Sequence, residues 1–262
     1  MREMVRFLDC TLRDGGYYND WNFSADLINE YLDAMPAAGI DTVELGFRSL
    51  RNDVFKGACA FTTDDFISSL EIPDEIVVGV MINASELIDG AKSIEESLEM
   101  LFPNKVQESR VGLVRVACHV HEFVAALPAV SWLKNRGFEV GFNLMQVADR
   151  SQEEVVNLSS EAAKWPLDVL YFADSMGGMN SEKTKEIIGW LRSHWMGDLG
   201  IHSHDNMGMA LQNTIFAIDE GVSWADSTVA GMGRGPGNTK TEYLAIGTSD
   251  IRGECNIIPL LG

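Results

Sequence analysis

The chain has 262 residues, a length that fits a single α/β barrel of roughly 250 residues. Its 39 acidic and 20 basic residues give a net charge of −19, which disfavours nucleic acid and anionic membranes as partners, because both require clustered Lys and Arg. An anionic substrate stays compatible with this charge, provided that a cation or a local positive site receives it.

The start of the chain and its cysteines indicate a compartment. The opening MREMVRFLDC has too short an apolar run for a signal peptide, and nowhere do eighteen apolar residues follow one another. The cysteines are far apart and form no C-x-x-C pair, so neither a zinc–thiolate site nor a disulfide framework is expected. They are Cys10, Cys59, Cys118 and Cys255. We expect a soluble cytoplasmic protein.

Strand-like and helix-like stretches alternate along the whole chain. Eight short stretches, mostly apolar and β-branched, have the composition of strands that are covered on both faces. The predicted strands are residues 6–11, 42–47, 76–82, 113–118, 139–144, 169–174, 200–203 and 227–230.

Segments with helical spacing lie between these strands. One of them begins at a suitable N-cap, Ser24, and carries an apolar face. That face comprises Leu27, Ile28, Tyr31, Leu32 and Met35. A capping box from Ser151 to Glu154 opens a later helix. Because no low-complexity linker divides the chain, residues 1–262 are predicted to form a single (β/α)₈ barrel domain, with a doubly wound open sheet as the alternative.

Two adjacent charges follow the first predicted strand, in LDCTLRDGGYYND. Taken alone, Arg13 and Asp14 have the pattern of a solvated surface pair. A third charge, Glu44, lies in the apolar run TVELGF of the second strand, where a carboxylate is costly unless it is paired or bound to a cation. Either Arg13 or Arg115 could pair with it.

Histidine pairs occur at two strand ends. His202 and His204 are separated by one residue, so both imidazoles point to the same face of an extended strand. Such a pair suits a divalent metal, and manganese accepts imidazole mixed with carboxylate. The alternative is a pair of hydrogen-bonded histidines at the barrel mouth. His119 and His121 follow the fourth predicted strand, where substrate contact and simple surface placement are both open.

A glycine-rich segment, GMGRGPGNTKTE, follows the eighth predicted strand. It is no P-loop, since no Gly-Lys-Ser/Thr follows the glycines. Glycine permits left-handed backbone and the close approach of a ligand. Loops after strands seven and eight of a barrel often hold phosphate, and Arg234 would give this one a positive charge. The alternative is a tight connection that needs glycine for its geometry alone.

Four of these motifs, taken in order, resemble one superfamily. DCTLRDGG, VELGF, HSHDN and AGMGRGPGN are similar to the motifs of the DRE-TIM metallolyases, which include hydroxymethylglutaryl-CoA lyase, isopropylmalate synthase and the 4-hydroxy-2-oxovalerate aldolases. RVACHVHE and YFADSMGGM resemble the aldolase branch. The resemblance spans nearly the whole chain and implies a (β/α)₈ barrel with a divalent metal, Mn²⁺ or Mg²⁺, at its C-terminal face.

The resemblance also implies roles for individual residues. Asp14, His202 and His204 match the metal ligands, and Asn238 matches a position that ligates or approaches the metal in some members. Arg13 matches the arginine that stabilises an enolate.

Further positions match the family around the substrate. Glu44 matches the signature glutamate, and Ser175 matches a position that contacts substrate after strand six. Arg115 and Arg234 are additional candidates for substrate binding.

The implied activity is that of an aldolase or lyase. It would cleave or form a carbon–carbon bond through the enolate of a 2-oxo acid such as pyruvate, with an aldehyde as the second small-molecule substrate. A homo-oligomer is compatible with this interpretation. The alternatives are a Claisen-type synthase that uses an acyl-CoA and a non-catalytic barrel that binds a metabolite.

Two features depart from the family pattern. The oxovalerate aldolases place a catalytic histidine shortly after the Arg-Asp pair, where this sequence has Tyr17 and Tyr18. We therefore expect Tyr17 to act as the general base, and the alternative is that a metal-bound water or a histidine such as His119 moves the proton. The chain also stops soon after the eighth strand, without the C-terminal helices by which those aldolases dock an aldehyde dehydrogenase. That region is either absent or trimmed, and we expect no dehydrogenase partner.

Overall fold

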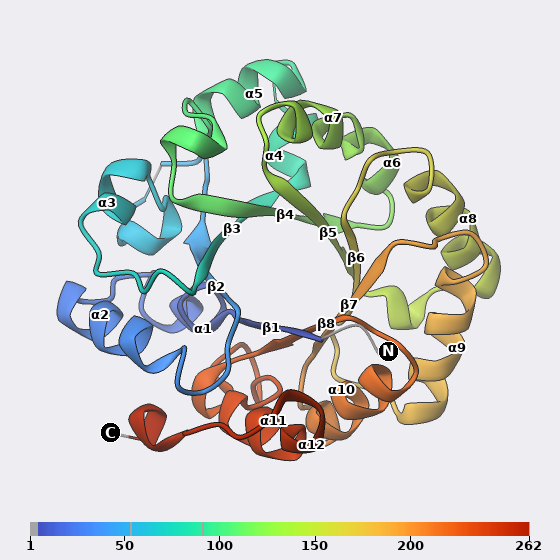
Figure 1. Cartoon of the computed structure of the whole chain (residues 1–262). Coiled ribbons are helices and arrows are strands. Elements are labelled where there is room, and N and C mark those ends of the chain that lie inside the picture. Colours follow the sequence, from blue (N-terminus) through green and yellow to red (C-terminus); the bar gives the residue numbers. More distant parts are fainter. Residues whose placement is uncertain (1–4, 53, 91, 262) are drawn as a thin grey trace.

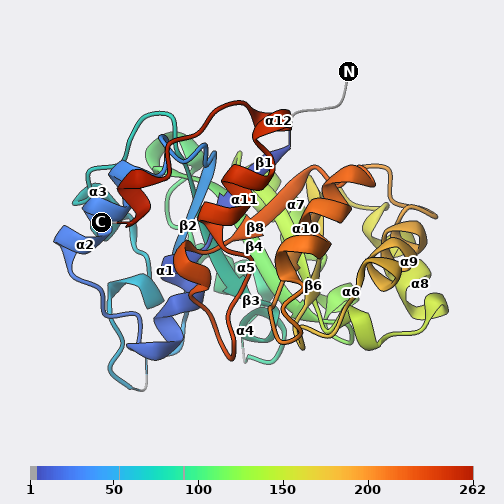
Figure 2. The same cartoon turned by 90° about the horizontal axis from the view of Figure 1, so that it is seen from below.

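Eight parallel strands close into a barrel in chain order, from β1 to β8, and helices surround it (Figures 1 and 2). The computed structural model describes residues 5–52, 54–90 and 92–261. Because β1 pairs in parallel with both β2 and β8, the sheet has no free edge. The predicted (β/α)₈ barrel is confirmed, and the open sheet is wrong.

The strands are β1 (Arg6–Asp9), β2 (Thr42–Phe47), β3 (Val77–Asn83), β4 (Val111–His119), β5 (Glu139–Met145), β6 (Val169–Asp174), β7 (Asp198–Ser203) and β8 (Trp224–Ser227). Seven of the eight agree with the prediction to within two residues at each end.

The first and last predicted strands need correction. β1 ends at Asp9 and not at residue 11, because the next residues form a one-turn helix. β8 lies three residues earlier than predicted, because Trp224–Ser227 pairs in register with Arg6–Asp9. The β-branched residues that suggested a strand at 227–230 instead enter a turn, in which Ala230 has a φ of 55°.

The α-helices are α1 (Thr11–Asp14), α2 (Ala25–Ala34), α3 (Asp64–Ser68), α4 (Ala84–Ile88), α5 (Ile94–Leu101), α6 (Phe123–Ala126), α7 (Pro128–Asn135), α8 (Gln152–Ala162), α9 (Ser181–Leu191), α10 (Ala210–Asp219), α11 (Thr241–Gly247) and α12 (Ser249–Arg252). Short 3₁₀ helices are η1 (Gly15–Tyr18), η2 (Ala58–Ala60), η3 (Val106–Glu108), η4 (Val147–Asp149), η5 (Val229–Gly231) and η6 (Ile258–Leu261). No helix in these described ranges is long and apolar enough to cross a membrane.

The predicted helix starts are confirmed. Ser24 accepts a hydrogen bond from the Leu27 amide, and Ser151 and Glu154 form both bonds of a capping box. One member of the predicted face of α2 was wrong. Leu27 is 50% exposed, because it lies on the wall of a surface hollow that Tyr31 and Leu260 also line.

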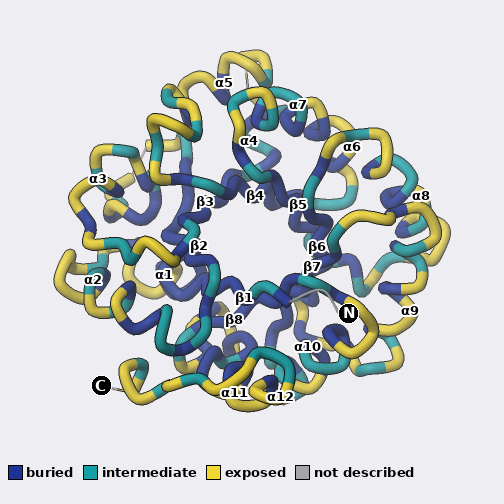
Figure 3. Tube along the Cα trace, in the orientation of Figure 1, coloured by how far each residue is buried: buried dark blue, intermediate teal, exposed yellow. Residues whose placement is uncertain are grey.

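Apolar side chains fill two regions. The larger lies between the barrel and the helices, so the strands are buried while the outer helix surfaces are exposed (Figure 3). The smaller closes the barrel interior near the amino ends of the strands. It comprises Leu8, Cys10, Leu113, Val169, Tyr171 and Trp224. The polar residues singled out in the sequence therefore collect at the opposite end, at the carboxyl ends of the strands.

Candidate functional site

The turn after β1 buries the charged pair that the sequence left ambiguous. Asp9 at the end of the strand accepts hydrogen bonds from the Thr11 amide and hydroxyl, which starts α1. The indole of Trp21 donates to the Arg13 carbonyl at 2.8 Å. A Cβ at Gly16 would lie 2.0 Å from that indole, so only glycine fits there. Arg13 and Asp14 are consequently 5% and 1% exposed, which excludes a solvated surface pair.

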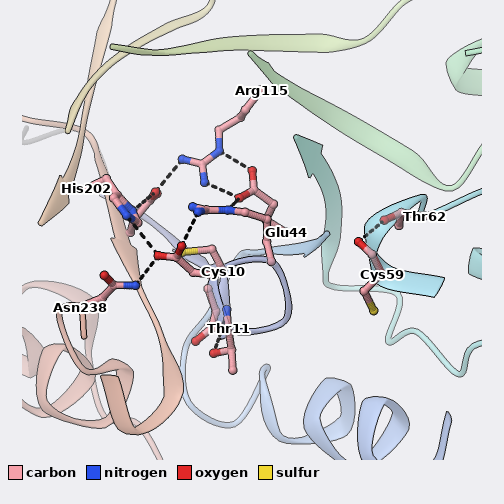
Figure 4. A network of polar contacts seen from close by, with 12 residues as sticks. Cys10, Thr11, Glu44, Cys59, Thr62, Arg115, His202 and Asn238 are labelled. Carbon is pink, nitrogen blue, oxygen red and sulfur yellow. Dashed lines mark hydrogen bonds and ion pairs between the residues drawn. The ribbon is translucent and has the colours of Figure 1, made fainter. Parts of the chain in front are cut away.

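Glu44 joins two arginines in the barrel interior (Figure 4). Its carboxylate accepts a bond from Arg13 Nε at 2.7 Å and two from Arg115, at 2.7 and 2.9 Å. Both arginines that the sequence offered as partners are therefore used. Burial disfavours the charged form of both arginines. Nevertheless, Asp14 and Glu44 raise the pKa of Arg13 above its ordinary value, and Asp226 and Glu44 do the same for Arg115.

The same network continues to the histidines. Arg115 Nη1 donates to Asp226 Oδ2 at 2.7 Å, and that oxygen lies 2.9 Å from His202 Nδ1. His202 Nε2 in turn faces Asp14 Oδ2 at 3.4 Å. The chain of contacts thus fixes the orientation of the His202 ring, which lies between Arg115 and Asn238 in Figure 4. Its Nε2 atom is directed at the Asp14 carboxylate.

Two more candidate ligands join Asp14 and His202. The rings of His202 and His204 lie with centroids 5.1 Å apart, and a backbone bridge pairs His204 with Asn238. The Asn238 amide donates to Asp14 Oδ2 and, at 3.2 Å, to the Met232 carbonyl. A Cβ at Gly233 would lie 2.5 Å from that amide, so the glycine-rich segment needs glycine to bring Asn238 in.

The charge states of the cluster bear on metal binding. Burial and the neighbouring His202 lower the pKa of His204 to about 3, which keeps its imidazole neutral with a free lone pair. Burial opposes protonation of His202, yet contacts with Asp14 and Asp226 raise its pKa well above the ordinary value. A ligating imidazole must be neutral, so a cation that binds there would displace this proton.

Cys10 also reaches the cluster. Its sulfur, a carboxylate oxygen of Asp14 and a ring nitrogen of His202 all lie within 4.8 Å of one another. Burial raises the pKa of the Cys10 thiol to about 11, and its Sγ faces the Ser227 carbonyl at 3.5 Å. A thiol must lose its proton to ligate a metal, so we expect the oxygen and imidazole donors to bind a cation in preference to Cys10.

A pocket opens above the cluster. It is lined by Arg13, Asp14, Tyr17, Phe47, Met81, Asn83, Ala117, Asn143, Met145, Ala173, Ser175, His202, His204 and Arg234. The structure therefore brings together most of the residues predicted for the site: the metal-ligand candidates beside Arg13, and Tyr17, Ser175 and Arg234 around the entrance.

Two of the entrance residues, Tyr17 and Arg234, contact each other. Tyr17 is 42% exposed, packs edge-on against Trp21, and lies under the Arg234 guanidinium at 4.7 Å from the ring centroid. Tyr18 instead bonds the Gly233 carbonyl through its hydroxyl. The Ser175 hydroxyl accepts a hydrogen bond from the Gln146 amide at 2.9 Å.

Four predicted residues lie outside the pocket lining, and two of them, Glu44 and Asn238, are bonded to the lining residues Arg13 and Asp14. Arg115 is completely buried beneath the pocket, and its contacts are with Glu44 and Asp226, so the structure offers it no path to a substrate. His119 is the last residue of β4, stacks on His121 at 5.6 Å, and lines a separate surface hollow. These contacts give neither Arg115 nor His119 a place in the pocket.

Two buried residues escaped the sequence analysis. Asp226 was overlooked because the eighth strand was predicted to start one residue after it. Asn143 lies inside the apolar strand segment GFNLM. In both cases a polar residue interrupts a buried strand, which is the signal that identified Glu44, and it would have found them too.

Comparisons with known proteins agree with this geometry. A family model described as HMGL-like matches residues 4–252. The chain is 28% identical over 241 residues to the 4-hydroxy-2-oxovalerate aldolase of Pelotomaculum thermopropionicum, which covers 92% of this chain and 68% of that protein. It is 29% identical to the 4-hydroxy-2-oxovalerate aldolase of Carboxydothermus hydrogenoformans, with 93% and 70% covered.

Solved structures show the same architecture. The N-terminal domain of a Bacteroides vulgatus protein proposed to be an aldolase superimposes with a TM-score of 0.88 at 30% identity, covering 98% of this chain and 83% of that one. The hydroxymethylglutaryl-CoA lyase of Pseudomonas aeruginosa gives a TM-score of 0.78 at 18% identity, covering 100% and 91%. The second likeness concerns the fold alone.

Proposed function

The chain belongs to the HMGL-like family, and from this premise we propose that it is a divalent-metal-dependent aldolase acting on a pyruvate-type 2-oxo acid and an aldehyde. As a member of this family with aldolase-named relatives along most of its length, it is a carbon–carbon lyase. The pocket supports the finer statement, because two arginines, one carboxylate and two imidazoles line it together.

Asp14, His202, His204 and Asn238 are the residues that would hold the ion. Asn238 Oδ1 is buried and has no hydrogen-bond partner in the described part of the chain, so an acceptor there is left for a cation. Asp14 Oδ2 faces both the Asn238 amide and His202 Nε2. Mixed oxygen and imidazole donors without a thiolate suit Mn²⁺ or Mg²⁺. When bound, the ion would act as a Lewis acid toward the carbonyl group of the 2-oxo acid.

A free donor on Arg13 is the observation that carries the proposal. Its Nε is bonded to Glu44 and its Nη1 to Asp14, whereas its Nη2 is buried and unpartnered among the described residues. A fixed, desolvated donor beside the reacting group is the arrangement that stabilises developing negative charge. Arg13 would therefore bind the 2-oxo acid oxygen where the enolate forms, and Glu44 would hold the guanidinium in place.

Cleavage of the aldol also needs a base. Removal of the proton from the aldol hydroxyl group lets the carbon–carbon bond break. One half leaves as the aldehyde, and the electron pair of the broken bond passes to the enolate of the 2-oxo acid. Protonation of the enolate carbon then gives the 2-oxo acid. We assign the hydroxyl proton to Tyr17, which lines the pocket. The adjacent Arg234 guanidinium packs over the Tyr17 ring and would hold it at the pocket entrance. Ser175 and Arg234 would contact the substrate.

The first half of this reaction can be tested without knowing the aldehyde. NMR of pyruvate in D₂O, with Mn²⁺ or Mg²⁺ supplied, should show exchange of the methyl protons in the presence of the enzyme. A panel of aldehydes then identifies the second substrate. Wild-type protein that catalyses neither exchange nor carbon–carbon bond formation with either metal would contradict the proposal.

A further inference from the structure

We infer that Asn143 determines the specificity for the aldehyde, by binding a hydroxyl group on that half of the substrate. The inference rests on the proposed aldolase function and deepens it, since it names hydroxylated aldehydes as the substrate class. It starts from a polar side chain on the wall of the pocket that faces away from the metal-ligand candidates.

Asn143 lies on β5, and in a closed barrel of eight strands β5 is diametrically opposite β1, which leads into Arg13 and Asp14. Its inward-facing neighbours in the lining are small or apolar. Ala117 on β4 is its direct partner in the sheet, and Ala173 on β6 and Met145 on β5 also line the pocket. Asn143 therefore stands among small and apolar side chains, and the other amide of the lining, Asn83 on β3, is already bonded to Glu86.

The amide of Asn143 is buried without being satisfied. The residue is 4% exposed, and its Oδ1 has no hydrogen-bond partner within the described ranges. A buried acceptor left without a partner destabilises a protein, so such a group is expected to have a ligand or water as its partner. Because Asn143 lines the pocket, the missing partner belongs to what the pocket binds.

The position and chemistry of this group select the partner. The 2-oxo acid is held by Arg13 on the opposite wall, so the space beside Asn143 receives the aldehyde half. A carboxamide both donates and accepts, and a hydroxyl group does the same, so the two match in either orientation of the amide. An aldehyde that carries a hydroxyl group next to its carbonyl would donate a hydrogen bond to Asn143 Oδ1, whereas an alkyl aldehyde would leave this oxygen without a partner.

Two neighbouring asparagines permit a controlled test. Asn83 lines the same pocket from β3, but its Nδ2 already donates to Glu86 Oε1 at 3.3 Å. Aldol formation from pyruvate is measured with glycolaldehyde and with acetaldehyde, and the ratio of the two kcat/KM values is compared for the wild type, Asn143→Leu and Asn83→Leu. Methyl-proton exchange of pyruvate in D₂O is followed in each protein.

The wild type should favour glycolaldehyde, and Asn143→Leu should reduce that ratio about tenfold or more, the scale of one buried hydrogen bond. Exchange should persist in this variant, because it depends on the opposite wall, and Asn83→Leu should keep the wild-type ratio. Should Asn143→Leu not fold, Asn143→Ala is measured in its place. An unchanged ratio in the Asn143 variant, or an acetaldehyde preference in the wild type, overturns the inference alone. Absence of exchange in the wild type overturns the proposed function as well.

Discussion

On the side of β1, β7 and β8 the pocket is lined by charged side chains that hold one another, whereas from β3 to β6 its strands contribute methionine, alanine and asparagine side chains. The first wall is tied into a continuous network that runs from Arg13 through Glu44, Arg115 and Asp226 to His202. The second wall has no such network: of its two asparagines, Asn83 is bonded to Glu86, and Asn143 has an unpartnered Oδ1 among the described residues.

This difference separates two tasks. Buried ion pairs are costly, because the desolvation of each charge is repaid only by good geometry, and apolar side chains of similar volume often serve stability equally well. A chain of five buried ionisable side chains therefore suggests a role in the reaction itself. The opposite wall can change without loss of that network, so it is suited to select the second substrate.

The most severe test of the charged wall removes a ligand. His202→Ala should lose most of its bound divalent metal and with it nearly all activity, since Asp14, His204 and Asn238 alone provide an incomplete donor set. Elemental analysis of protein purified without chelator should give about one ion per chain in the wild type and much less in the variant. Equal metal content in the two proteins would remove His202 from the ligand set.

Arg13→Lys should separate the two members of the Arg-Asp pair. Lysine keeps the charge but cannot bond Glu44, Asp14 and the substrate at once, so turnover should fall by about 10²–10³, the scale of losing an oxyanion donor. Metal content should stay close to that of the wild type, while Asp14→Asn should reduce it. Full activity of Arg13→Lys would show that Nη2 of Arg13 does not act on the substrate in the wild type.

Tyr17→Phe tests the entrance, which lies between the two walls. If Tyr17 moves the hydroxyl proton, aldol cleavage should slow by about 10²-fold, as expected for loss of a general base. Methyl-proton exchange of pyruvate should survive, because it depends on Arg13 and the metal. Tyr18→Phe is a suitable control, because its hydroxyl is bonded to the Gly233 carbonyl. Cleavage at the wild-type rate would exclude Tyr17 as the base.

The two walls also differ in how far the sequence predicts them. Arg13, Asp14, His202 and His204 were identified because their spacing and motifs are local, and Glu44 because a carboxylate in an apolar strand demands a partner. The closed barrel followed from alternating strands and helices. The pairing of Glu44 with both Arg13 and Arg115 required the closed structure, since residues 31 and 71 positions apart come together there.

Asp226 shows where local patterns fail. Thr228 and Val229 have strong β-propensity, which placed the eighth strand three residues late, yet the pairing of Trp224–Ser227 with β1 decided the strand. Arg115 shows the opposite case, in which the sequence suggested a role at the surface of the pocket. It was a candidate for substrate binding, but its side chain is completely buried below the pocket. Tertiary pairing, and not composition, settled both positions.

The smallest expected effect concerns this overlooked carboxylate. Asp226 contacts no pocket space, but it orients the His202 ring through Nδ1 and is paired with Arg115. Burial alone would raise its pKa, but Arg115 and His202 hold the pKa below the ordinary value, so the carboxylate is charged. Asp226→Asn keeps the size of the side chain and removes that charge.

A carboxylate behind a metal-binding histidine fixes the ring and increases its basicity, and loss of such a partner typically weakens metal binding by about 10–100-fold. We therefore expect Asp226→Asn to reduce metal affinity by that factor, measured by titration of the metal-free protein, with activity restored at saturating metal. Asp174→Asn is the matched control, because Asp174 is equally buried at the end of β6 but accepts bonds from the Gly178 and Met179 amides. If both variants lose stability alike and neither changes metal affinity, Asp226 stabilises the barrel and does not act on the metal site. The charged residues that act on the metal would then be limited to those that line the pocket.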